Sequence, residues 1–436
     1  MTSAIKNSFW YLFFNLSRLV VLFLGTMWIS RVLGPESFGQ FSYLLSVIVF
    51  VSAIDSLCHE SIVKQYLTQH QDAGLIMGTA SLLNLILAAI AVLFILIFGF
   101  LTIPESLLLA TFFLFIPGQL SKPINPVANL FDIRLLSKYS SLGLFVGALI
   151  SIVFRVGGVS FSHDLWFQSL GYSMQTLVYA GVLYLLYRKK LEHLEWKVSL
   201  QLLREMVKKS SPIFLSALVY LSISQSDIFF IRHMLGAHEV GIYSVVVKLS
   251  EPWVIVSSAL CTSYFPLIFR SAHNLKKQAD YFIRANQISV YFVSILGLVL
   301  SLAIEFIVRL LLGPAYSEVS SIFRIYYWSI IFLFFANIQH IWEVYNGLYS
   351  VSLYKTIVTC ILKIALSFIL GRLYGLQGFA LATVISLFFY GVGFNFFNAT
   401  TRPYLALQTR AFTLSEAKKN YRLFRQRAKK WLKKEY

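Results

Sequence analysis

Long apolar runs follow one another along this chain from its first residues almost to its end. Each run is about twenty residues long, which lets a helix cross a hydrocarbon core of roughly 30 Å. Turns and short polar connections separate the runs, and none of the connections is long enough to hold a soluble domain. We predict twelve membrane-spanning helices at residues 8–30, 38–62, 75–101, 105–125, 138–160, 164–187, 210–235, 239–268, 284–312, 321–346, 354–373 and 377–400.

A short motif near the start of the chain returns about two hundred residues later. Residues 33–41 and 235–243 both read Leu-Gly, four residues, Gly, one residue and an aromatic. A basic residue precedes each copy, Arg31 in the first and Arg232 in the second. Two similar membrane halves are how many transporters build a central path for a solute. The repeat therefore predicts an all-α integral membrane protein of about twelve transmembrane helices, in two six-helix bundles around a central cavity.

The longest internal connection lies between the sixth and seventh spans and divides the chain. Its apolar residues recur at helical spacing among charges, which predicts an amphipathic helix on the cytoplasmic membrane surface. An even number of spans in each half relates the halves by an axis along the membrane normal. The predicted parts are an N-terminal six-helix bundle (1–187), a cytoplasmic amphipathic linker (188–209), a C-terminal six-helix bundle (210–400) and a basic cytoplasmic tail (401–436).

Charge placement sets the predicted orientation. Most Lys and Arg fall in alternate connections, and few, Arg155 among them, fall on the opposite side, so both termini are expected in the cytoplasm. The net charge is +18, and the tail after Thr401 supplies about half of it. Attraction to anionic lipid explains a basic cytoplasmic tail, at about 1 kcal/mol per basic residue. Membrane lipid, and no nucleic acid, is therefore the expected partner of this charge.

Ionisable and polar side chains recur inside the predicted spans of both halves. A charge at the bilayer centre costs at least ~2.5–3.5 kcal/mol, so such residues are expected to face the bundle interior or a wet cavity. The candidate cavity residues are Asn15, Arg18, Asp55, Asp227, Lys248, Glu251, Glu343 and Lys363. The three cations, Arg18, Lys248 and Lys363, lie on three different spans. If they share one cavity, they repel each other unless an anion or nearby carboxylates offset their charge.

A purely structural alternative stays open for each of these charges. Lys248 and Glu251 are three residues apart and can pair on one helix. Arg18 with Asp55, or Asp227 with Lys363, can form ion pairs that lock neighbouring helices.

Sequence motifs of soluble enzymes are absent from the chain. There is no Walker loop, and His59-Glu60 is not followed by a second His at metalloprotease spacing. The three cysteines, Cys58, Cys261 and Cys360, lie in apolar runs without CxxC spacing and are expected to be small core residues. We predict no catalytic residues, no metal and no cofactor, and a protein that is not an enzyme.

Several stretches together resemble a known family. Residues 31–39, 227–231, 235–243, 248–249, 312–316 and 375–383 are similar to the polysaccharide transporter family (O-antigen flippase type) of the multidrug/oligosaccharidyl-lipid/polysaccharide exporter superfamily. The resemblance implies two six-helix bundles whose central cavity opens alternately to each side. It implies flipping of an undecaprenyl-pyrophosphate-linked oligosaccharide across the bacterial inner membrane, from the cytoplasmic to the outer face. The product serves O-antigen or other surface polysaccharide assembly, with a polysaccharide polymerase and a chain-length regulator as further partners.

The resemblance gives the candidate residues two roles. Arg18, Lys248 and Lys363 are expected to receive the pyrophosphate as charge-assisted donors, with Asn15 beside them. Coupling to H⁺ or Na⁺ is assigned to the carboxylates Asp55, Asp227, Glu251 and Glu343.

Three other functions compete with this hypothesis. A cation-coupled multidrug antiporter of the same superfamily predicts a cavity dominated by acids, whereas cations are prominent here. A membrane scaffold of a polysaccharide assembly complex depends on the basic tail to recruit enzymes. A membrane glycan polymerase is disfavoured, because no long outer loop carries a cluster of acids and bases.

Overall fold

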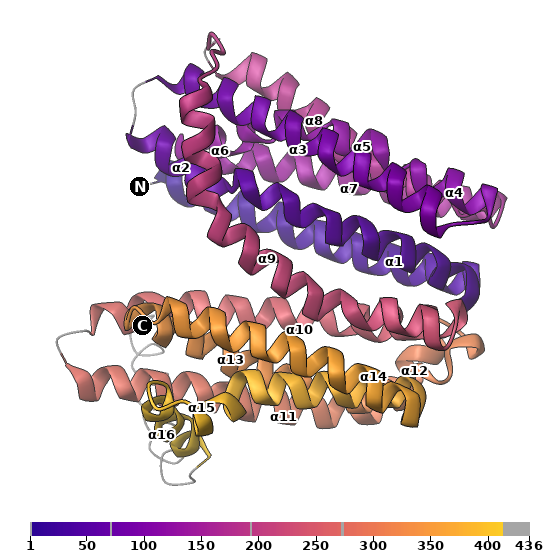
Figure 1. Ribbon diagram of the computed structural model, residues 1–436, viewed down its shortest axis with the longest axis vertical. Helices are drawn as coiled ribbons and strands as arrows, with labels where there is room; N and C mark the ends of the chain where they lie inside the picture. The colour runs from indigo at the N-terminus through magenta and orange to yellow at the C-terminus, as the bar shows by residue number, and fades with distance from the viewer. Residues whose placement is uncertain (1, 70–71, 192–193, 272–273, 413–436) are drawn as a thin grey trace, which may run out of the picture. The chain divides into compact units, whose positions relative to one another are not determined.

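A computed structural model describes residues 2–69, 72–191, 194–271 and 274–412, and Cys261 and the tail beyond 412 lie outside the side chains that it describes. In these ranges the chain is helical, without a strand. The chain divides into two compact units (Figure 1), Met1–Arg232 with Gly236–Gly241, and His233–Leu235 with Ile242–Tyr436. The predicted bundle boundaries at 187 and 210 remain a prediction.

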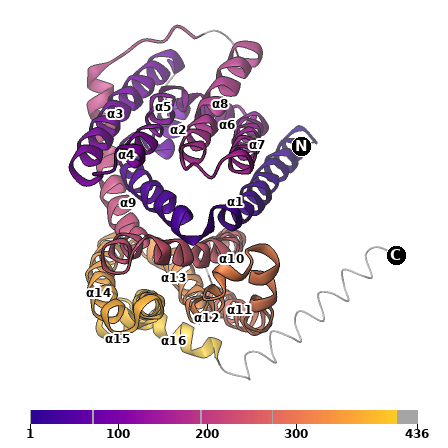
Figure 2. The same cartoon turned by 90° about the vertical axis from the view of Figure 1, so that its right-hand side faces the viewer.

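The first unit is built around α7, which contacts both α1 and α8 (Figures 1 and 2). Helix α1 is bent into two arms, which Figure 2 shows on either side of the bend. The unit contains α1 (Thr2–Val51), η1 (Ser52–Cys58), α2 (Glu60–Gln69), α3 (Ala73–Thr102), α4 (Ser106–Phe113), α5 (Ile116–Leu120), η2 (Lys122–Ile124), α6 (Pro126–Ile133), α7 (Ser137–Phe161), α8 (Trp166–Lys190) and nearly all of α9 (Leu200–Met234).

The second unit contains most of α10 and every described element after it. A buried cluster of Ile268, Phe282, Ile338 and Tyr404 joins α10, α11, α13 and α16. The elements are α10 (Ala237–Arg270), α11 (Leu275–Leu311), η3 (Pro314–Tyr316), α12 (Val319–Tyr326), α13 (Ser329–Tyr345), α14 (Tyr349–Phe388), the π-helical η4 (Phe389–Gly393), α15 (Phe394–Phe397) and α16 (Arg402–Ala411).

The helices account for the twelve predicted spans. Eight stretches are long and apolar enough to cross a membrane by length and composition. Two of them, Phe9–Gln69 and Tyr349–Phe397, bend at Gly34 and Gly375, so each holds two predicted spans. Helices α8 and α10, of 25 and 34 residues, complete the set. The predicted fold class is confirmed, and the chain is a multi-pass membrane protein.

The repeated motif forms a tight helix turn and a helix crossing. Gly34 and Gly236 have φ values of +73° and +131°, which side chains with a Cβ rarely adopt. The second glycine of each copy permits backbone contact between the copies. A Cβ on Gly39 would lie 1.8 Å from the Ala237 carbonyl oxygen, and one on Gly241 would lie 2.0 Å from that of Pro35. All of these residues, including Gly236–Gly241 of the second copy, belong to the first unit, so these backbone contacts lie within it.

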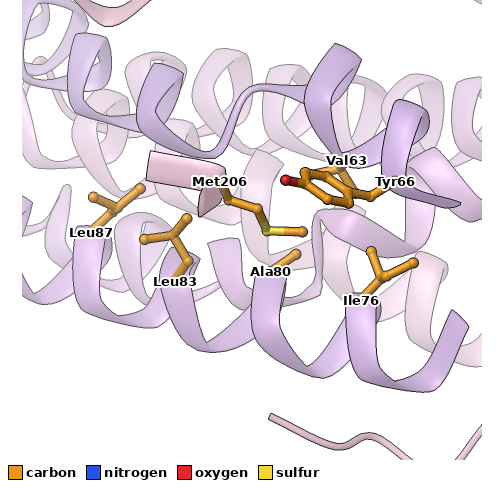
Figure 3. Packing of buried hydrophobic residues seen from close by; sticks show 7 residues of the cluster. All are labelled: Val63, Tyr66, Ile76, Ala80, Leu83, Leu87 and Met206. Atoms are coloured by element: carbon orange, nitrogen blue, oxygen red, sulfur yellow. The ribbon is translucent and has the colours of Figure 1, made fainter. Parts of the chain in front are cut away.

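The connection between α8 and α9 differs from the predicted amphipathic helix over 188–209. Helix α8 ends at Lys190, residues 194–199 are not helical, and Leu200 begins a helix that continues to Met234. The non-helical segment lies on α3, where Lys197 N donates to Gly74 O at 3.3 Å. Buried Met206 packs with side chains of α2 and α3 (Figure 3). Part of the apolar face therefore covers protein, and residues 200–209 form the first part of the long helix α9.

Candidate functional site

The first arm of α1 carries a polar face beside the start of α7. Asn15 Nδ2 donates to Ser141 Oγ at 3.1 Å and to Tyr11 O at 2.8 Å. Arg18 follows one turn later and is partly buried, and its buried Nε has no hydrogen-bond partner among the described residues. The Tyr179 hydroxyl lies within electrostatic reach of Arg18. A guanidinium with an unused donor is suited to bind an anion, because its fork matches phosphate and carboxylate oxygens.

Asp55 is paired with a lysine from another part of the first unit. It lies in η1, and Lys122 Nζ of η2 contacts its Oδ2 at 2.6 Å. The pairing of Arg18 with Asp55, which was one structural alternative, is therefore wrong. Lys122 belongs to a span that three prolines break into short helices, and this irregular backbone brings its side chain to η1.

Asp227 is buried in α9, with 5% of its surface exposed. It belongs to the first unit and Lys363 to the second, so their pairing stays a prediction.

Lys248 and Glu251 form the local pair that their spacing predicted. Lys248 Nζ lies 2.6 Å from Glu251 Oε1 on α10, and both side chains remain substantially exposed, at 37% and 50%. The interaction is therefore an accessible one, and the ammonium is available to a second anion.

Lys363 is almost completely buried in the second unit. Its Nζ donates to Thr383 Oγ1 at 2.5 Å, and Thr383 also lies 3.2 Å from the Tyr243 hydroxyl. Lys363 and Thr383 stand on the two arms of α14, on opposite sides of the bend at Gly375. The bend therefore places a cation and two hydroxyls together inside the second unit.

Glu343 forms a buried ion pair that the sequence reasoning missed. Lys355 Nζ contacts its Oε1, and the two side chains are 0% and 1% exposed. Lys355 lies in the second turn of α14. No periodicity relates the two positions, because a turn separates α13 from α14.

A chain of buried amides extends from this ion pair. Gln339 Nε2 donates to Glu343 Oε1 at 2.9 Å and to Asn395 Oδ1 at 2.8 Å. Asn395 Nδ2 donates to Gln408 Oε1 at 3.1 Å, and Gln408 Nε2 donates to the Gly391 carbonyl oxygen at 2.7 Å. Gly391 lies in the π-helical turn η4. The network therefore joins α13, α14, η4, α15 and α16 through one continuous set of hydrogen bonds.

Arg155 was expected on the outer side of the membrane, among the few basic residues there. It lies inside α7 with 4% of its surface exposed, and Gln168 Oε1 accepts a hydrogen bond from its Nε at 2.8 Å. The described part of the chain contains no group of three His, Cys, Asp or Glu side chains arranged to hold a metal ion.

These features describe an all-helical membrane protein with cations buried or half-buried in both units. Residues 4–272, more than half of the chain, match the family described as polysaccharide biosynthesis protein. The chain therefore belongs to the polysaccharide biosynthesis protein family. No curated protein sequence gives a match.

Solved transporter structures share the fold of the chain. An inward-facing multidrug resistance transporter of the MATE family in the MOP superfamily matches with a TM-score of 0.68 at 14% identity, covering 91% of this chain and 96% of that one. The lipid II flippase MurJ, in an inward closed conformation, also has a TM-score of 0.68, at 15% identity, with coverage of 93% and 90%. A MOP superfamily transporter from Pyrococcus furiosus gives a TM-score of 0.64 at 15% identity, with coverage of 93% and 96%. The chain has the fold of MOP superfamily transporters.

Proposed function

We propose that the protein is a flippase for undecaprenyl-pyrophosphate-linked oligosaccharide repeat units. It moves them by alternating access from the cytoplasmic to the outer face of the bacterial inner membrane, for O-antigen or other surface polysaccharide assembly. One observation carries the proposal: a chain of the polysaccharide biosynthesis protein family has the fold of MOP superfamily transporters over more than nine-tenths of its length. A structurally similar protein is described as a lipid II flippase, which acts on a lipid-linked substrate.

The chemistry of the substrate fits the cations of both units. A pyrophosphate carries oxygen acceptors that charge-assisted N–H donors bind strongly. Arg18 offers a guanidinium whose Nε has no described partner, and Lys248 offers an ammonium that is 37% exposed. Lys363 is the third cation proposed to bind the pyrophosphate, and Asn15 is proposed to lie beside the binding residues. The lipid tail can stay in the bilayer while these residues bind the head group.

Ion coupling is assigned to the carboxylates Asp55, Asp227, Glu251 and Glu343, with Asp227 as the leading candidate. Outward movement of an anion from a negative-inside cell is favourable by about 2.3 kcal/mol per charge per 100 mV, so the potential alone is a competing driving force. Transport of a lipid-linked oligosaccharide into vesicles, with an H⁺ or Na⁺ gradient imposed separately, separates these cases. A transport rate that is the same with and without each gradient contradicts ion coupling.

Single neutralisation of the pyrophosphate cations is expected to lower transport. Each of Arg18→Gln, Lys248→Gln and Lys363→Gln removes one charge-assisted hydrogen bond, worth about 1.5–3 kcal/mol, or roughly a ten- to hundred-fold loss. The measurement is surface polysaccharide in a deletion strain that expresses each variant, with lipid-linked single repeat units counted on the cytoplasmic face.

The matched control is Lys189→Gln, an exposed cation at the end of α8. It is expected to leave surface polysaccharide unchanged. Normal polysaccharide in all three cavity variants, at normal protein levels, contradicts the proposed binding roles.

The same strain tests the rival functions. A multidrug antiporter predicts drug sensitivity of the deletion strain with normal surface polysaccharide. A scaffold predicts failure on removal of residues 413–436, a truncation that keeps α16 and Gln408 and that a flippase largely survives. A polymerase predicts lipid-linked single repeat units on the outer face, whereas loss of a flippase retains them on the cytoplasmic face.

A further inference from the structure

Arg155 is a buried cation without a carboxylate partner. It is 4% exposed in α7, and no described Asp or Glu lies within ion-pair distance of it. Of its guanidinium nitrogens, only Nε donates to a described residue, Gln168 Oε1 at 2.8 Å. A guanidinium has five N–H donors, so four remain for another acceptor. Burial of a charge without compensation is strongly unfavourable, which calls for a ligand of opposite charge at this position.

The surrounding helices hold the Arg155 side chain in one place. Its aliphatic stem fills the space left by Gly171, where a Cβ would lie 2.3 Å from Arg155 Cγ. The guanidinium carbon lies 5.4 Å from the centre of the Phe41 ring. Gln168 also donates back to the Arg155 carbonyl oxygen at 3.4 Å. A guanidinium fixed from three sides loses little entropy when it binds a ligand, which favours recognition of an oxyanion.

Aromatic rings and one further cation lie around this position. Phe41 stacks on Phe115 with ring centres 6.3 Å apart, and Phe115 meets the edge of Tyr172 at 5.5 Å. The Tyr172 hydroxyl lies within electrostatic reach of both Arg155 and Asp55.

The charges of this group do not balance. Asp55 is the carboxylate near Tyr172, and it already contacts Lys122 at 2.6 Å. These side chains carry two positive charges against one negative charge. An anion is therefore needed to neutralise the group.

We propose that Arg155, with Gln168 and Tyr172, forms an oxyanion-binding site within the first unit. The ligand is a phosphoryl or carboxylate group. Its source, the charged part of a lipid-linked glycan, rests on the proposed function. The site is separate from Arg18. Asn15 bonds Ser141 and Gly25 packs on Ile152, so Arg18 lies level with the first third of α7. Arg155 follows about ten residues later, or about 15 Å at 1.5 Å per residue, which gives two successive cationic positions along α1 and α7.

The test is anion binding to the purified full-length protein in detergent. Isothermal titration calorimetry at constant ionic strength uses sodium pyrophosphate, glucuronate and uncharged glucose as probes. The variants are Arg155→Met, Arg155→Lys and the exposed control Arg188→Met, all in a background with Arg18, Lys248 and Lys363 changed to Gln. We expect pyrophosphate or glucuronate to bind this background, the Kd to rise at least ten-fold in Arg155→Met and less in Arg155→Lys, and the control to bind normally.

The stronger probe identifies the ligand group as phosphoryl or carboxylate. A thermal unfolding scan without anion separates a binding role from a packing role. Removal of an uncompensated charge should leave the melting temperature of Arg155→Met equal to or above that of its background, whereas a packing role predicts a clear fall.

Three results overturn the proposal: no anion binding in the background protein, binding to Arg155→Met within two-fold of it, or an equal loss in the Arg188→Met control. Transport is measured separately in vesicles. Anion binding that depends on Arg155, in a protein that does not move lipid-linked glycan, refutes the proposed function and leaves the site standing. Transport with Arg155-independent binding refutes the site alone.

Discussion

Gly39→Ala and Gly241→Ala are each expected to lower the yield of folded protein sharply. The added Cβ would lie 1.8 Å from Ala237 O in the first case and 2.0 Å from Pro35 O in the second. Overpacking costs about 1–3 kcal/mol where side chains can move, and a backbone carbonyl cannot rotate away, so we expect about 3 kcal/mol. For a chain of 436 residues, that corresponds to a fall of about 3–6 °C in melting temperature. Size-exclusion chromatography and thermal unfolding in detergent measure both effects.

Gly157→Ala is the matched control for these two variants. Gly157 lies in α7, and a Cβ there would meet no atom within 4 Å. Alanine is favoured over glycine in a helix by about 1 kcal/mol, so the control should be as stable as the parent protein or more so. If Gly39→Ala or Gly241→Ala matches Gly157→Ala in yield and melting temperature, the two motif copies do not depend on backbone contact.

Lys355→Met is expected to destabilise the protein by about 3–5 kcal/mol, because it leaves a buried carboxylate without its cation. Glu343 is 1% exposed, so water cannot replace the ammonium. Glu343→Gln should have a smaller effect, since Lys355 keeps its position 4.6 Å over the Tyr390 ring. Thermal unfolding of the three proteins in detergent measures the difference.

A double mutant separates the ion pair from the packing around it. Lys355→Met combined with Glu343→Met removes both charges, and such apolar replacements of buried pairs are often neutral, so the double variant should recover most of the loss. Arg309→Met is the control, because Arg309 and Glu305 pair at 2.7 Å on α11 while 75% and 54% exposed. Exposed pairs contribute about 0–1 kcal/mol. Equal melting temperatures for Lys355→Met and Arg309→Met contradict the importance assigned to the buried pair.

The predicted spans agree closely with the helices wherever apolar residues run without interruption. The spans at 75–101 and 138–160 correspond to α3 (Ala73–Thr102) and α7 (Ser137–Phe161). Prediction was poorer where packing competes with periodicity. Residues 188–209 have helical spacing throughout, but residues 194–199 lie on α3 and are not helical. Contact with α3, rather than the local pattern, decides the backbone there.

The sequence predicted which polar residues lie inside the helices better than it predicted which residues they contact. Lys248 and Glu251 face each other on one helix, so their 2.6 Å contact follows from a spacing of three. Asp55 contacts Lys122, and Glu343 contacts Lys355, across helices whose packing no spacing rule provides. The sequence places Arg155 among the outer basic residues and does not reveal its burial. That burial depends on contacts with Gly171, Phe41 and Gln168, which come from different parts of the chain.

The amino-acid sequence by itself determined the class of this protein, the positions of its long helices and the polar residues within them. Hydrophobicity and helix periodicity are local properties, so a run of apolar residues is readable before any contact forms. Only the tertiary structure decided which carboxylate faces which cation, and that buried Arg155 faces no carboxylate among the described residues. The reason is physical: the energy of a buried charge depends on distances between side chains of different helices, and those distances arise only when the helices pack.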